Sequence, residues 1–166
     1  MKLKFIFASA LFAAAAIPSM AQTHVEGEEY YKADQIANAK ELLNRNMNNA
    51  GTDKAVSNYY LGLIALEEGN KSEAQNYFNA GVSANPEYAY NYIGLGYIDL
   101  LNGDKSAAEK QFKEAENREK KSPSLNIAIA RAYYGADPAV YAKEIEKRIE
   151  KARKADMKNA DIYLFE

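Results

Sequence analysis

The sequence contains no cysteine, no tryptophan and only one histidine. Without cysteine the chain has neither disulfides nor thiol chemistry. The lone imidazole, His24, lies close to the expected mature N-terminus, where we expect it to be exposed or frayed. Metal ligation would fall to carboxylates alone, and no acidic stretch has the spacing of a calcium loop. We therefore expect no catalytic residue, no metal and no cofactor, and a fold stabilised by side-chain packing.

The sequence also lacks a hydrophobic run long enough to cross a bilayer, which needs about 20 apolar residues. The longest apolar run covers residues 5–17, follows Lys2 and Lys4, and is broken by Pro18. Small residues at 19 and 21 complete the pattern of a signal peptide over residues 1–21, with cleavage after Ala21. We therefore expect an exported chain, most simply in the periplasm, with no membrane insertion after cleavage.

Basic residues do not outnumber acidic ones. The chain has 21 Lys plus Arg against 23 Asp plus Glu, a formal net charge of −2. Loss of Lys2 and Lys4 with the signal peptide would change that charge to −4. Binding to a phosphate backbone requires a positive surface. The composition therefore argues against a nucleic-acid partner.

What the sequence does contain is a repeat of about 34 residues. One set of small residues recurs at intervals of 35, 34 and 34, and a set of alanines recurs at the same intervals. We expect both sets where helices approach most closely, with two phenylalanines filling the space between helices. The first set is Gly27, Gly62, Gly96 and Ala130, the second is Ala39, Ala74, Ala108 and Ala142, and the phenylalanines are Phe78 and Phe112.

Turn and capping residues divide the chain into helix pairs. We predict pairs over 24–32 and 36–46, 55–68 and 71–84, 88–101 and 105–120, and 123–134 and 139–155. Asp53 is expected to cap the second pair, and Asn70 with Glu73 has the spacing of a capping box. Asp137 before Pro138 predicts another helix start. The corresponding repeats cover about 22–54, 55–88, 89–122 and 123–158.

The end of the chain departs from the period. Ala152 falls about three residues later than the repeat requires, so we predict a lengthened last helix. Residues 159–166 begin another first helix without a second helix to pack on. We expect either that the chain is a fragment of a longer array or that this stub docks as an irregular cap.

The repeat resembles the tetratricopeptide-repeat (TPR) family over nearly all of the expected mature chain, particularly its exported members. The third repeat matches the family pattern at Tyr92, Leu95, Gly96, Ala108, Phe112 and Ala115. Asn58 and Asn126 depart from the pattern by replacing the leading aromatic, and Asp99 stands where an aromatic is usual. The resemblance implies an all-α solenoid of about four helix-turn-helix repeats plus the first part of a fifth.

In such arrays the first helices line the concave side, which is what the resemblance implies here. Besides the packing face, these helices carry side chains at i, i+4 and i+7, a spacing that places them on one side of each helix. Tyrosine and arginine often anchor protein interfaces. The candidate groove residues are Tyr59, Leu63, Leu66, Tyr90, Ile93, Tyr97, Leu100, Arg131 and Tyr134.

Two interpretations of this face stay open. Leu66, Ile93 and Leu100 fit the core as well as the groove, whereas Tyr59, Tyr97, Arg131 and Tyr134 are expected to be exposed. Asp99 is a candidate perturbed carboxylate, although a hydrogen bond from a neighbouring tyrosine hydroxyl is the simpler expectation.

The sequence therefore predicts a non-catalytic interaction scaffold that binds a protein or peptide partner in its concave groove. The alternative is a structural or assembly module that self-associates or stacks on further C-terminal repeats. A third possibility is an enzymatic domain beyond Glu166, for which this array would recruit the substrate.

Overall fold

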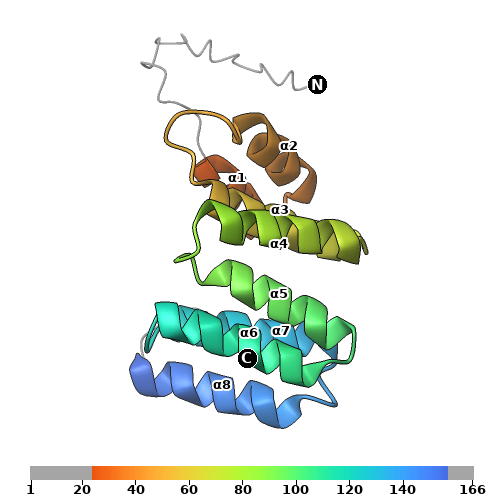
Figure 1. Ribbon diagram of the computed structural model, residues 1–166, viewed down its shortest axis with the longest axis vertical. Coiled ribbons are helices and arrows are strands. Elements are labelled where there is room, and N and C mark those ends of the chain that lie inside the picture. Colours follow the sequence, from red (N-terminus) through yellow and green to blue (C-terminus); the bar gives the residue numbers. More distant parts are fainter. Residues whose placement is uncertain (1–23, 157–166) are drawn as a thin grey trace, which may run out of the picture.

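The computed structural model describes residues 24–156, which form eight α-helices and no strand (Figure 1). Apart from the start of the last helix, each helix boundary lies within two residues of its prediction. The signal peptide and the start of a fifth repeat lie outside the described residues. The helices are α1 His24–Lys32, α2 Ile36–Asn46, α3 Lys54–Glu67, α4 Lys71–Ala84, α5 Tyr90–Leu101, α6 Lys105–Arg118, α7 Pro123–Ala136 and α8 Ala142–Ala155.

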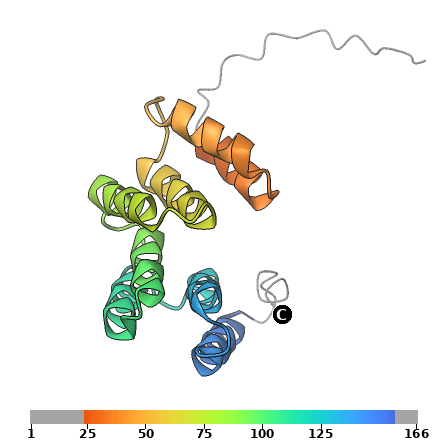
Figure 2. The same ribbon diagram turned by 90° about the vertical axis from the view of Figure 1, so that its right-hand side faces the viewer.

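The helices form two layers. Each odd-numbered helix packs against the even-numbered helix that follows it, and α1, α3, α5 and α7 also neighbour one another in sequence order. The even-numbered helices are further apart, and side chains such as Glu116 and Arg148 bridge α6 and α8. Because one layer is packed more closely than the other, the helix pairs follow an arc, as Figure 2 shows. The odd-numbered helices therefore line the concave side.

Glycines allow the two helices of a pair to approach closely. A Cβ added to Gly27 would lie 2.5 Å from Leu43, and one added to Gly62 would lie 2.4 Å from Phe78. A Cβ added to Gly96 would likewise lie 2.5 Å from the ring of Phe112. The 34-residue period of small residues in the sequence is thus a period of helix contacts in the structure.

The turns inside the second and third pairs repeat one geometry. Gly69 and Gly103 have φ of +79° and +81°, a conformation that favours glycine. The N–H groups of Asn70 and Asp104 reach back to carbonyls five residues earlier, which closes α3 and α5. Asp53 caps α3 as predicted, since its side chain accepts from the N–H groups of Ala55 and Val56. The capping box at Asn70 was a wrong prediction, because that side chain makes no cap hydrogen bond.

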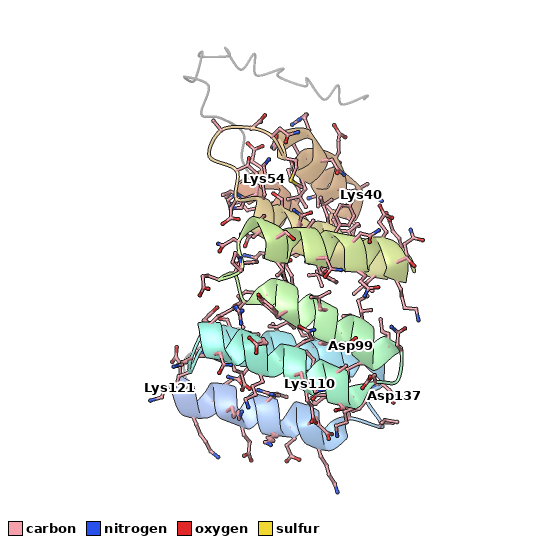
Figure 3. All side chains as sticks on the ribbon, viewed as in Figure 1. Lys40, Lys54, Asp99, Lys110, Lys121 and Asp137 are labelled. Carbon is pink, nitrogen blue, oxygen red and sulfur yellow. The ribbon has the colours of Figure 1, made fainter. Side chains whose placement is uncertain are left out.

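The fourth pair absorbs its three extra residues in the turn. Helix α8 has 14 residues, the same length as α4 and α6, so the prediction of a lengthened last helix is wrong. Asp137 Oδ1 accepts from the N–H groups of Ala139 and Val140, which makes a separate turn before α8 (Figure 3). Ala142, which was expected at a close helix contact, consequently lies at the first turn of α8 and is exposed, so that prediction is wrong. Ile145 is buried in the core.

No helix within residues 24–156 is long and apolar enough to cross a membrane.

Candidate functional site

A groove of about 580 Å³ opens on the concave side. This volume falls within the range of about 300 to 1,000 Å³ that is usual for ligand pockets. Its wall comes from α1, α3, α5 and α7 and from Tyr88, which precedes α5. Six tyrosines line it, Tyr31, Tyr59, Tyr60, Tyr88, Tyr90 and Tyr97, together with the aliphatic residues Leu63, Leu66, Ile93 and Ile127 and the charged residues Glu28, Lys32, Glu67 and Arg131.

The structure brings seven of the nine candidate residues together in this groove: Tyr59, Leu63, Leu66, Tyr90, Ile93, Tyr97 and Arg131. The other two lie elsewhere. Leu100 is 4% exposed and belongs to the core cluster that contains Phe112 and Tyr133. Tyr134 is 57% exposed but does not line the groove. Both are the i+7 members of their helices, and they lie two turns along α5 and α7 from Ile93 and Ile127, which do line the groove.

Tyr59 differs from its expected exposure. It is only 9% exposed, and its ring centre lies 5.2 Å from that of Tyr60, 5.5 Å from Tyr90 and 6.2 Å from both Phe78 and Tyr88. Aromatic pairs at such distances and inclinations stabilise one another. Tyr59 is therefore the centre of an aromatic cluster that forms the floor of the groove.

Two lining tyrosines that the sequence analysis missed connect α1 to α3. The hydroxyl of Tyr31 donates to Glu67 Oε1 at 2.7 Å, and that of Tyr60 donates to Glu28 Oε1 at 2.9 Å. Lys32 Nζ also lies 2.6 Å from Glu28 Oε1. The adjacent tyrosines at 30–31 and 59–60 were the available signal, since neighbours on a helix lie only about 100° apart and both rings of a pair can reach the same groove.

Several hydrogen-bond donors of the groove have no acceptor in the described part of the chain. Both carboxylates, Glu28 and Glu67, already accept hydrogen bonds. Among residues 24–156, the hydroxyls of Tyr59, Tyr88 and Tyr97 have no hydrogen-bond acceptor. Arg131 is exposed and makes no ion pair with any described residue. The groove therefore offers a guanidinium and several hydroxyl donors to a bound molecule.

Burial keeps the groove tyrosines protonated. Loss of solvent raises the pKa values of Tyr31, Tyr59, Tyr60 and Tyr88 well above their usual 10.0. Nearby Glu28 raises the pKa of Tyr60 further, and the positive charge of Arg131 partly opposes the rise at Tyr59. At neutral pH these hydroxyls are therefore neutral donors.

The same shifts predict loss of stability in alkaline solution. A pKa that is higher in the folded state contributes stability that is fully present below the unfolded pKa of 10.0. That contribution is lost as the pH rises above 10. We expect the free energy of unfolding to stay level from neutral pH to about pH 10 and then to fall, with tyrosinate absorbance appearing together with loss of helical circular dichroism. Tyrosines that all ionise near pH 10 in a fully helical protein would contradict this expectation.

The lone histidine, His24, and the candidate carboxylate Asp99 do not line the groove. No three His, Cys, Asp or Glu side chains within residues 24–156 are placed to hold a metal ion. His24 was expected to be exposed or frayed, but it begins α1, and its Nδ1 accepts from the N–H of Asp53 at 2.9 Å. Asp99 lies near the end of α5, outside the groove (Figure 3). Burial, helped by Asp104, raises its pKa, and no tyrosine hydroxyl among the described residues donates to it.

Comparison with known proteins supports the fold. No protein-family model matches the sequence, and no curated protein matches it significantly. Similar solved structures include YrrB, described as a TPR protein with an unusual peptide-binding site, with 15% identity and a TM-score of 0.51 over 83% of this chain and 69% of YrrB. MamA has 21% identity and a TM-score of 0.51 over 80% of this chain and 75% of its own. TTC0263, a TPR protein of Thermus thermophilus, has 17% identity and a TM-score of 0.49 over 84% of this chain and 93% of its own.

These likenesses concern architecture. At such low identity the likenesses to YrrB and MamA show only that the chain has the all-α repeat solenoid fold found in TPR proteins, and they transfer no ligand.

Proposed function

We propose that this protein is a non-catalytic interaction scaffold that holds a segment of a partner protein in its concave groove. The observation that carries the proposal is the groove itself, where side chains from four successive helix pairs converge on one hollow. Aromatic residues and arginine are the side chains that most often anchor protein interfaces. The peptide-binding site described for YrrB, a protein of similar fold, agrees with this function.

The charge pattern also favours a protein partner. The groove wall mixes aliphatic and tyrosine side chains with one guanidinium that lacks an ion-pair partner among the described residues. It has no cluster of basic residues that would neutralise a nucleic-acid backbone. We further propose that the protein works in the periplasm after cleavage of residues 1–21, with no nucleic-acid or membrane partner.

The test is capture of the partner by crosslinking in the native cell envelope. Leu66 is half-buried in the groove wall, so Leu66→Arg adds a bulky cation to the groove beside Lys32 and Arg131. We expect this variant to lose at least about tenfold of the specific crosslinked product, which corresponds to a penalty of about 1.4 kcal/mol or more.

The matched control is Gln75→Arg on α4. Gln75 is exposed and does not line the groove, so this change adds the same charge at a distance from the site. If Gln75→Arg and Leu66→Arg reduce the crosslinked product equally, the partner does not bind in the groove. Solution scattering tests the alternative of a self-associating assembly module. That alternative would be supported if the protein assembles with rising concentration and neither change abolishes the assembly.

A further inference from the structure

The groove contains hydrogen-bond donors that lack an acceptor in the described part of the chain. Three tyrosine hydroxyls, those of Tyr59, Tyr88 and Tyr97, and the guanidinium of Arg131 have no acceptor among the described residues. Of the lining carboxylates, Glu28 Oε1 accepts from Tyr60 and Lys32, and Glu67 Oε1 accepts from Tyr31, so these oxygens already bind donors of the groove itself. A matching ligand must therefore bring acceptors for the three hydroxyls and the guanidinium.

A bound α-helix does not meet this condition. Its backbone carbonyls already accept hydrogen bonds within the helix, so they would leave the tyrosine hydroxyls unsatisfied. An ordinary extended strand offers free carbonyls, but it also brings one N–H per residue, and an N–H that faces the aromatic rings would lose its hydrogen bond to water without gaining another.

A proline-rich segment meets the condition. Proline has a backbone carbonyl but no N–H. In the polyproline II conformation the chain makes no internal hydrogen bonds, so its carbonyls are free to accept from outside. Proline rings also pack well on aromatic side chains, and grooves lined by aromatic residues are a general means of recognising such segments.

Most aromatic rings of the groove pack on one another. The ring centre of Tyr88 lies 5.4 Å from that of Tyr90 and 6.2 Å from that of Tyr59. Tyr97 lies apart from these rings, two turns further along α5, with its hydroxyl beside Gly135 of α7, where an added Cβ would lie 2.2 Å from it. Because the rings pack on one another, they are rigid before a ligand binds, which lowers the entropic cost of binding.

The position of Arg131 also predicts a negative charge on the ligand. Arg131 is exposed on α7, and its positive charge acts on Tyr59 of α3 and Tyr31 of α1. A carboxylate on the ligand would form a charge-assisted hydrogen bond with this guanidinium.

We propose that the groove binds a proline-rich segment in the polyproline II conformation, with tyrosine hydroxyls donating to its carbonyls and Arg131 pairing with one acidic side chain. This inference rests on the proposed function, because it names the ligand of the same groove.

The test uses the full chain and short acetylated, amidated peptides in isothermal titration calorimetry. The probe is a run of prolines with one glutamate at its centre. One comparison peptide replaces the prolines by alanine, a strong helix former. A second comparison peptide replaces the glutamate by glutamine. We expect the proline probe to bind at least about tenfold more tightly than the alanine peptide, because the proline peptide already has the polyproline II conformation and brings fewer N–H groups that binding would desolvate.

Variants that remove only the hydroxyl group test the proposed contacts. Tyr88→Phe and Tyr97→Phe keep the rings, and each should weaken binding of the probe by about 3- to 10-fold. The control is Tyr30→Phe on α1, which lies outside the groove and should change nothing. Arg131→Gln should weaken binding of the glutamate probe by about tenfold and leave binding of the glutamine peptide unchanged.

The outcomes separate this inference from the function on which it rests. If the alanine peptide binds as tightly as the proline probe and Leu66→Arg abolishes its binding, the groove is a peptide site but the proline-rich ligand is wrong. If Tyr88→Phe and Tyr97→Phe leave the affinity unchanged, the proposed hydrogen bonds are also wrong. If neither peptide binds and Leu66→Arg does not alter crosslinking in cells, both proposals fail.

Discussion

Replacing Phe78 by alanine is expected to lower the free energy of unfolding by about 3 to 5 kcal/mol, the usual cost of removing a buried aromatic side chain. Phe78 on α4 is fully buried. Its ring lies against Gly62 of α3 and Gly94 of α5, so it joins the second helix pair to the third. Its loss would leave a cavity at this junction and would also remove support from Tyr59, whose ring centre lies 6.2 Å away.

The measurement is denaturant-induced unfolding followed by circular dichroism. Tyr77→Ala is the matched control, because Tyr77 precedes Phe78 on the same helix but is only half-buried. We expect the control to cost about 1 kcal/mol, near the average for single substitutions. If Phe78→Ala lowers the free energy of unfolding no more than Tyr77→Ala does, the junction between the second and third helix pairs does not stabilise the array.

Replacing Gly62 by leucine is expected to cost about 1 to 3 kcal/mol through overpacking. Even a methyl group at Gly62 would lie 2.4 Å from Phe78 Cε1, so the ring would have to move. It has little room, because a Cβ on Gly94 would lie 2.3 Å from the same atom on its other side. This cost should exceed the gain of about 0.5 to 1 kcal/mol that a non-glycine residue brings to a helix.

A double-mutant cycle isolates this contact. Gly62→Ala should destabilise the wild-type protein, but it should cost less in a Phe78→Leu background, where the smaller side chain leaves space. Ala80→Leu, at an exposed position of α4, controls for the general effect of adding a leucine to a helix. If Gly62→Ala and Phe78→Leu have strictly additive effects in unfolding experiments, the close approach of these residues is not what makes glycine necessary at position 62.

The fold could be predicted from the sequence because its determinants are local and repeat. Each small residue, such as Gly62 or Gly96, marks one helix contact, and the 34-residue interval repeats that contact along the chain. Asp53 could be identified as a cap because the signal lies within three residues of the groups that it bonds. The fourth pair was misread because Asp137 and Pro138 carry the signal of a helix start, but the turn that follows them belongs to the connection between the helices.

The groove was predicted less completely. Spacing on one helix correctly grouped Tyr59, Leu63 and Leu66 on one side, and all three line the groove. Spacing could not show that neighbouring rings would cover Tyr59, since Tyr88 and Tyr90 lie at the start of the next helix pair. Nor could it indicate that Leu100 faces the core, because that depends on how α7 packs against α5.

By itself, the sequence determined the class of architecture, the helix pairs of residues 24–156 and most positions where helices must approach closely, because these depend on residue types at fixed short intervals. Only the tertiary structure decided which side chains share the groove, which hydroxyls have an acceptor and which charge lacks a partner. Those properties arise between helices that are about 34 residues apart in the chain, and the curvature of the whole array sets the distances between them.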